Sequence, residues 1–96
     1  MPRLALPALH AHPALPGHFP GQPVVPGVVL LELAQRAVEE ASGQRVAGVA
    51  MAKFLSPAGP DDLLTLDFSL GDDSARFDIL AGERRIASGR FSLGEP

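Results

Sequence analysis

The sequence contains no cysteine, tyrosine or tryptophan, and its charged residues form no basic run. Without cysteine the chain forms no disulfide, holds no thiolate-bound metal and uses no thiol nucleophile. The formal net charge of -3 and the missing basic run argue against nucleic-acid binding. The longest apolar run, residues 24–31, contains Pro26 and Gly27 and is too short to span a bilayer. The first residues do not resemble a signal peptide, so we expect a cytoplasmic protein with a single domain, residues 1–96.

A loop rich in proline and glycine is predicted over residues 10–27, which contain half of the ten prolines of the chain. No helix or strand fits this stretch, because proline interrupts both, yet the stretch is too apolar for a disordered linker. A long, rigid loop of this kind is typical of a functional segment. His18 lies in it and is the only ionisable residue between positions 13 and 31.

A helix is predicted over residues 27–42, because apolar side chains recur there at helical spacing. Pro26 suits its first turn, and Gly43 suits a left-handed C-terminal cap. Apolar side chains alternate elsewhere, which predicts strands over residues 3–9, 45–54, 63–70, 75–81 and 85–93. We therefore predict an α+β fold, in which an antiparallel sheet of about five strands wraps around one central helix. The last four strands are expected to form a meander.

Glu32 is an unusual residue in this helix. Residues 30, 31, 33 and 34 are all apolar, so we expect Glu32 to be buried rather than to lie on an ordinary helix surface. A buried carboxyl group is rare without a partner, and burial favours its protonated form, which suits a proton donor. Histidine is suited to act as a general base near neutral pH, so we interpret His18 and Glu32 as a proton-transfer pair.

The start of the helix offers a third chemical group. The first N–H groups of the helix, from Gly27 onward, have no partner within it, and they lie at the positive end of its dipole, where they can hold a developing oxyanion. Every helix has such an end, so this group indicates a site only together with a nearby acid and base.

Histidines at positions 10 and 12 resemble a metal-binding pair, but no third ligand accompanies them. The glycines around His18 do not match a phosphate-binding loop, and no lysine follows them. We therefore expect no metal and no bound cofactor.

The stretch GHFPGQPVVPGVVLLE, residues 17–32, closely resembles the signature of 3-hydroxyacyl-acyl-carrier-protein dehydratases of the FabA/FabZ type. His18 and Glu32 have the signature spacing of fourteen residues, and Pro23, Pro26 and Gly27 fall in register with it. The stretch AKFLSPAGPDDLLTLDFSL, residues 52–70, resembles the family more weakly. The resemblance extends over essentially the whole chain.

This resemblance implies a hot-dog fold and a lyase activity. His18 would remove the proton alpha to the thioester carbonyl, and Glu32 would protonate the departing beta-hydroxyl group. The Gly27 N–H would hydrogen-bond the thioester oxygen. The residues expected to contact or support the substrate are Phe19, Pro20, Gly21, Val24, Val25, Val28 and Phe54.

The resemblance also implies partners. The substrate would arrive on the phosphopantetheine arm of acyl carrier protein, and two subunits would pair edge to edge, either as a homodimer alone or as a homodimer within a trimer of dimers. Each active site would take its histidine from one subunit and its acid from the other. Carrier protein is acidic, so a basic surface should bind it. The candidate residues are Arg36, Lys53, Arg84, Arg85 and Arg90.

Two departures from the family pattern bear on function. Arg36 replaces a frequent glutamine one helical turn after Glu32. An arginine paired with Glu32 would favour the charged carboxylate and oppose a proton-donating role. Either Arg36 points away, toward carrier protein, or Glu32 acts as a carboxylate that orients water or the hydroxyl group, and we favour the first alternative. The chain also lacks the tyrosine that gates the acyl tunnel in many relatives. Compact members with a similar motif resemble dehydratases of aryl polyene and related specialised pathways.

Two other function classes remain open at this point. A hot-dog thioesterase would hydrolyse the same kind of thioester, although such enzymes generally lack the His-Phe-Pro-Gly loop. A non-catalytic subunit that binds carrier protein is the third reading, and retention of both His18 and Glu32 argues against it.

Overall fold

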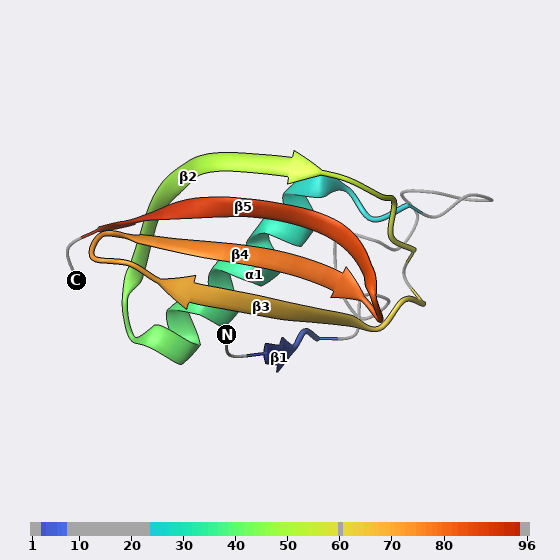
Figure 1. The fold of residues 1–96 in the computed structure, drawn as a ribbon, viewed down its shortest axis with the longest axis horizontal. Helices are drawn as coiled ribbons and strands as arrows, with labels where there is room; N and C mark the ends of the chain where they lie inside the picture. Colours follow the sequence, from blue (N-terminus) through green and yellow to red (C-terminus); the bar gives the residue numbers. More distant parts are fainter. Residues whose placement is uncertain (1–2, 8–23, 60, 95–96) are drawn as a thin grey trace.

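The computed structural model describes residues 3–7, 24–59 and 61–94. It contains one helix, α1 (Gly27–Ser42), and one five-stranded sheet. The strands are β1 (Arg3–Ala5), β2 (Arg45–Phe54), β3 (Leu64–Leu70), β4 (Ser74–Ala81) and β5 (Arg84–Gly94). All neighbouring strands are antiparallel, and α1 crosses one face of the sheet (Figure 1). The predicted α+β architecture is therefore confirmed.

The strand order is β1-β3-β4-β5-β2, so the predicted four-strand meander is wrong in one respect. Strands β3, β4 and β5 follow one another, but β2 pairs with β5 rather than with β3. The long connection after Phe54 carries the chain from one side of the sheet to the other before β3 begins. As a result, β2 is an edge strand, and its other edge is unpaired within the described residues.

Strand β1 is shorter than predicted. It ends at Ala5, two residues before Pro7. Proline has no backbone N–H to donate to a hydrogen bond between strands. Residues 8 and 9 of the predicted strand, and most of the predicted proline-rich loop, lie outside the described residues. The side chain of Arg3 holds β1 to β3 by two hydrogen bonds to the Asp67 carboxylate, at 2.6 and 2.8 Å. These bonds hold the pKa of Asp67 below its usual range.

The bounds of α1 match the prediction because both of its ends are set by local chemistry. Pro26 precedes the first turn with φ -60° and ψ 145°, an extended conformation that Pro favours. Gly43 ends the helix with φ 73° and donates its N–H to the Glu39 carbonyl at 2.9 Å. The Glu39 carboxylate in turn accepts the Val46 N–H at 2.8 Å, which connects the helix to β2.

The core lies between α1 and the concave face of the sheet. Helix residues Val29, Leu30, Leu33, Ala34 and Val38 are buried against it. Alternate residues of β3, β4 and β5 point inward, and Phe77 of β4 stacks on Phe91 of β5 with ring centroids 4.5 Å apart. Two register shifts in the β2–β5 ladder bend the edge strand toward the helix. No helix among the described residues is long and apolar enough to cross a membrane.

Gly89 of β5 lies against the backbone of Met51 and the ring of Phe77. A Cβ added there would collide with the Met51 carbonyl oxygen and would lie 2.8 Å from the ring of Phe77. Because one of these neighbours is backbone and the other is a buried ring, neither can move freely. Gly89 therefore lets β2, β4 and β5 approach closely.

We predict that Gly89→Ala lowers the free energy of unfolding by roughly 1–3 kcal/mol, the usual cost of overpacking a core. Gly48→Ala is the matched control in β2, because nothing in the described part of the chain lies within 4 Å of an added Cβ. That control should stay within about 0.5 kcal/mol of the parent. Urea unfolding of the three proteins measures both values, and equal stabilities would contradict the packing described.

Candidate active site

Of the residues predicted to form the site, His18, Phe19, Pro20 and Gly21 lie outside the described residues. Gly27, Glu32, Val24, Val25, Val28 and Phe54 are described. They come from the beginning of α1, from the segment before it and from the end of β2. The described part of the site is therefore the junction between these two elements.

Gly27 is the first residue of α1, and its N–H has no intrahelical acceptor. The first turn is closed by the Pro26 carbonyl, which accepts the N–H groups of Val29 and Leu30 at 3.0 and 3.3 Å. Neither Pro26 nor any other described side chain caps the first turn. Within the described residues the Gly27 N–H makes no hydrogen bond, so it is available to an oxygen atom of a ligand.

The ring of Phe54 packs directly on Gly27. A Cβ added to Gly27 would lie 2.7 Å from the ring tip and 2.8 Å from the next ring carbon. A glycine is therefore needed here for the close approach of β2, and not for an unusual backbone angle. Because Phe54 is 54% exposed, it offers an apolar surface beside the free N–H. Two residues that the sequence analysis assigned to separate roles, Gly27 and Phe54, thus lie in contact.

Glu32 is not buried within this chain, which corrects the sequence-based expectation. Its side chain is 42% exposed, and its Oε1 lies 3.0 Å from a terminal nitrogen of Arg36. Leu30, Leu33 and Ala34 turn toward the sheet, whereas Glu32 lies on another stripe of the helix. The expectation that Arg36 points away is also wrong, because one helical turn brings the two side chains together.

The three valines around the helix start have different environments. Val25 is buried at 4% exposure, so it supports the junction from inside the core. Val24 and Val28 are 45% and 72% exposed. Four further apolar side chains are exposed along β2 and just after it, namely Val49, Met51, Phe54 and Leu55, of which Met51 belongs to the outer face of the sheet. We refer to Val24, Val28, Val49, Phe54 and Leu55 as the edge patch.

Glu32 lies five positions after Gly27, which corresponds to a rotation of about 140° around the helix axis and a rise of about 7.5 Å along it. The free N–H of Gly27 points out of the start of the helix along its axis, whereas the Glu32 side chain projects from the flank of the helix. No cluster of three or more metal-binding side chains occurs in the described ranges, and the His10–His12 pair lies outside them.

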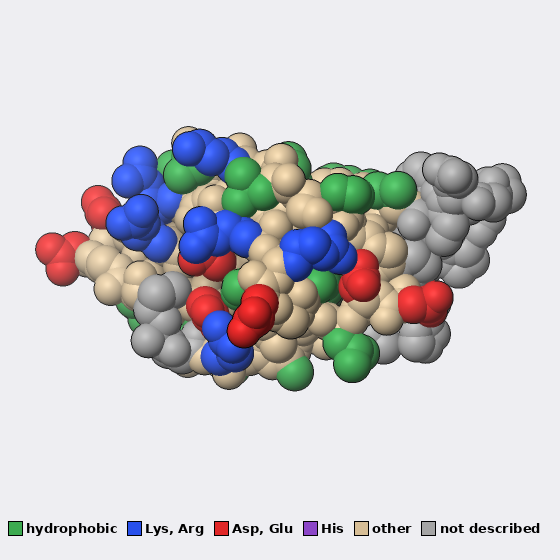
Figure 2. All heavy atoms as spheres, turned by 45° about the vertical axis from the view of Figure 1, so that its right-hand side comes forward, with side chains coloured by type: hydrophobic (Ala, Val, Ile, Leu, Met, Phe, Trp, Pro, Cys, Tyr) green, Lys and Arg blue, Asp and Glu red, His purple; other side chains and the backbone are tan. Residues whose placement is uncertain are grey.

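Sequence reasoning missed a basic residue on the outer face of the sheet, the face away from α1. Arg76 of β4 lies directly opposite Arg90 of β5, and Met51 of β2 follows in the same row. Basic side chains spread over much of the surface seen in Figure 2. The strand register was needed to find this pair, because fourteen positions separate the two arginines in the sequence.

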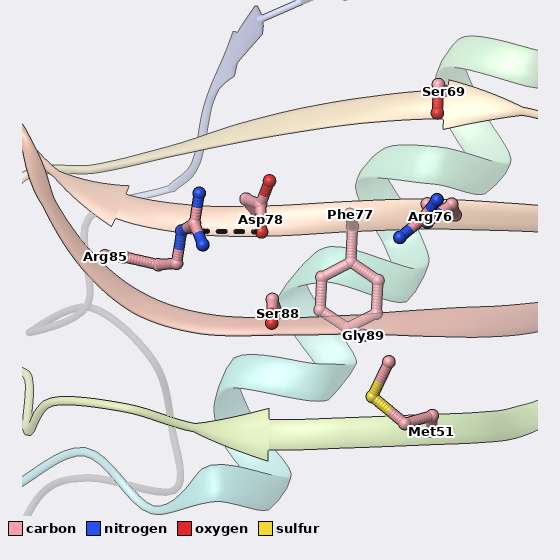
Figure 3. A pocket seen from close by; sticks show the side chains of 8 residues that line it. All are labelled: Met51, Ser69, Arg76, Phe77, Asp78, Arg85, Ser88 and Gly89. Atoms are coloured by element: carbon pink, nitrogen blue, oxygen red, sulfur yellow. Dashed lines mark ion pairs between the residues drawn. The ribbon is translucent and has the colours of Figure 1, made fainter.

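A pocket of about 320 Å³ opens on the same outer face (Figure 3). Arg76, Ser69 and Ser88 contribute its polar groups, and Met51 contributes apolar surface. Arg85 also lines it and forms a long ion pair with Asp78 at 3.8 Å. The outer face therefore combines positive charge with a small, mainly polar hollow.

Comparison with known proteins identifies the fold as a hot-dog fold. The structure titled the dehydratase heterocomplex ApeI:P from Xenorhabdus doucetiae matches with a TM-score of 0.82 at 23% identity, over 97% of this chain and 86% of that one. An uncharacterised protein from Erwinia carotovora subsp. atroseptica matches with a TM-score of 0.74 at 29% identity, over 96% and 81% of the two chains. The fluoroacetyl-CoA-specific thioesterase FlK has the same fold, with a TM-score of 0.62 at 19% identity, over 97% and 84%.

The family is also identified by sequence. Residues 3–90 match the model of the ApeI-like family, described as ApeI dehydratase. The 3-hydroxyacyl-acyl-carrier-protein dehydratase FabZ of Chlamydia trachomatis is 38% identical over 97 residues, which cover 84% of this chain and 63% of the relative. FabZ of Thermus thermophilus is 43% identical over 68 residues, which cover 60% and 48%. The chain belongs to the ApeI-like dehydratase family, and it spans less than two thirds of the length of these FabZ relatives.

The contact between Gly27 and Phe54 predicts a coupling that unfolding experiments can measure. Gly27→Ala should destabilise the parent because the Phe54 ring must move aside. In a Phe54→Ala background the same substitution should be harmless, because the obstructing ring is absent. We expect a coupling energy of about 1 kcal/mol from this double-mutant cycle. Additivity within about 0.3 kcal/mol would mean that the ring does not rest on Gly27.

Proposed function

We propose that this chain is a 3-hydroxyacyl-acyl-carrier-protein dehydratase. It would remove water from a 3-hydroxyacyl thioester and release a trans-2-enoyl thioester. The observation that carries the proposal is the free Gly27 N–H beside the exposed ring of Phe54, in a chain of a dehydratase family. The match to the ApeI-like family favours a substrate of aryl polyene or related specialised biosynthesis over bulk fatty acid synthesis.

In the proposed reaction, His18 removes the alpha proton and the electron pair moves toward the thioester carbonyl. The Gly27 N–H stabilises the negative charge that develops on the carbonyl oxygen. The electrons then form the alpha–beta double bond as the beta C–O bond breaks. Glu32 donates its proton to the departing hydroxyl group, which leaves as water. A later proton transfer from His18 to Glu32, through solvent, restores both groups.

The ion pair between Glu32 and Arg36 opposes this role for Glu32, but only weakly. An exposed pair at this helical spacing contributes about 0.3–0.5 kcal/mol, which changes a rate about two-fold. General acid catalysis contributes about 10²- to 10⁴-fold. Giving up the ion pair when substrate binds therefore costs much less than the proton donation gains, and Glu32 remains the proposed acid.

We further propose that the active sites form between two copies of the chain. The Gly27 N–H points out of the start of α1, whereas the Glu32 side chain projects from its flank. Strand β2 is an unpaired edge within the described residues, and the edge patch leaves apolar side chains exposed beside it. Pairing of two β2 edges would cover this patch and would allow the acid of one copy to complete the site of the other.

The central prediction concerns the proton-transfer pair. His18→Ala and Glu32→Gln should each lower the rate of dehydration by at least about 10²-fold, with little change in Tm. The measurement is the loss of water from 3-hydroxyacyl carrier protein, aliphatic and aryl, followed by mass shift. Arg36→Gln serves as the matched control on the same helix and should alter the rate by only about two-fold.

The same assay separates the alternatives. Release of free acid would indicate a thioesterase, a candidate supported by the shared fold of FlK. No product from the purified chain, but product after addition of a second hot-dog protein, would indicate a subunit of a mixed complex. The structure titled ApeI:P is such a heterocomplex. Either result would contradict the proposal of an active homo-oligomeric dehydratase.

The proposed partner is an acidic carrier protein, and the described contacts separate the candidate basic residues. Arg36, Arg84 and Arg85 are each engaged in ion pairs. Lys53 and Arg90 form no ion pair with any described residue, and neither does Arg76. Two like charges directly opposite each other on neighbouring strands are destabilising, and an acidic partner would relieve the repulsion between Arg76 and Arg90. We therefore propose the outer face around this pair as the docking surface.

We predict that Arg90→Glu raises the KM for substrate on carrier protein about ten-fold and leaves the KM for a free pantetheine thioester unchanged. Tm should not fall, because the new carboxylate faces Arg76. Arg45→Glu is the control, since Arg45 is equally exposed but lies at the far end of β2. Equal effects of the two substitutions on KM would remove the Arg76–Arg90 pair from the docking surface.

A further inference from the structure

Arg84, at the start of β5, binds the loop that follows β2. One terminal nitrogen of its guanidinium donates to the Ser56 hydroxyl oxygen and to the Pro57 carbonyl, both at 2.6 Å. The other terminal nitrogen lies 3.4 Å from the Asp62 carboxylate. Arg84 thus contacts this loop near both of its ends. A guanidinium is suited to this task, because its N–H groups form a rigid planar fork.

The loop is held by further hydrogen bonds on both sides of these contacts. The Ile86 carbonyl of β5 accepts the N–H groups of Leu55 and Ser56 at 2.8 and 3.2 Å. The Asp62 carboxylate accepts the Gly59 N–H at 2.8 Å, and the Asp62 N–H donates to the Gly59 carbonyl at 3.1 Å. The described residues of the loop are therefore bonded to one another and to β5.

The loop in turn holds the segment that leads into α1. Ala58 is 2% exposed, and its carbonyl accepts the Val25 N–H at 2.8 Å. Pro26 follows, with a φ that its ring fixes, and Gly27 comes next. Because little rotational freedom remains between Val25 and Gly27, the direction of the Gly27 N–H depends on where the Ala58 carbonyl lies.

We infer that Arg84 is a positioning residue for the active site: through the Ser56–Asp62 loop and the Ala58–Val25 hydrogen bond, it sets the direction of the Gly27 N–H. This inference rests on the proposed role of Gly27 in the dehydratase reaction. It also gives Arg84 a task other than carrier-protein docking, since its guanidinium is committed to the loop. Arg84 touches neither substrate nor Gly27 and acts only through these bonds.

The test compares Arg84→Met with Arg85→Met. Both substitutions remove an exposed arginine from the start of β5 together with one ion pair, but Arg85 contacts Asp78 rather than the loop. Amide hydrogen exchange at Val25 should become about ten-fold faster or more in Arg84→Met, as expected when a local opening becomes easier. Exchange at Val25 in Arg85→Met should remain as in the parent.

Kinetics provide a second readout. Arg84→Met should lower kcat about 10- to 100-fold with little change in KM, because a shift of about 1 Å in a catalytic group can cost about 10²-fold. Arg84→Lys should retain only part of the parent kcat, since an ammonium group does not reproduce the planar fork of the guanidinium. Unchanged exchange at Val25, or a uniform rise at all protected amides, would overturn the inference. If the parent itself shows no dehydratase activity, the proposed function is wrong. The exchange result at Val25 then still tests whether Arg84 positions the start of the helix.

Discussion

The hydrogen bond from the Val25 N–H to the Ala58 carbonyl is the constraint on which the rest of the candidate site depends. It joins two segments that lie more than thirty positions apart in the sequence, and both of its residues are buried. The ring of Pro26 fixes its φ angle, so the position of Val25 determines the backbone direction at Gly27, where α1 begins. Among the described residues, the helix start is therefore fixed by contacts with other elements and not by a side-chain cap. Its N–H groups remain available while its position is defined.

This arrangement explains why apolar residues are exposed around a polar group. Phe54 packs on Gly27 and places an apolar ring next to the residue that carries the free N–H. A hydrogen bond to a developing negative charge is stronger where water is excluded. The same surface leaves the edge patch uncovered in the single chain, and a small domain gains stability by burying such a patch. Catalysis and assembly would then rely on the same residues, since pairing along β2 both covers the patch and supplies a second carboxylate.

The sequence predicted those features that local chemistry determines. Pro26 and Gly43 marked the ends of α1 correctly, and alternation located β2 to β5 to within one residue. Features that depend on strand order were not predictable in this way. The meander placed β4 beside β5 correctly, but the register shift after Ile79 that puts Arg76 opposite Arg90 was not predicted. It placed β2 beside β3, so the contact of Arg84 with the loop after β2 was not found and Arg84 was assigned to docking. The burial of Glu32 was also misjudged, because neighbours in the sequence lie on different stripes of a helix. The role of His18 stays a prediction from the motif, since it lies outside the described residues.

The most direct test of the account is the response of the Gly27 amide to a substrate analogue. An amide-linked 3-hydroxyacyl pantetheine has the carbonyl oxygen of the substrate in nearly the same place but does not undergo dehydration readily. It would be titrated into the ¹⁵N-labelled protein, and the Gly27 N–H resonance would be followed. The account predicts a downfield shift of this proton that saturates with binding, as expected for a new hydrogen bond to oxygen. Saturable binding that leaves the Gly27 resonance in place would contradict it.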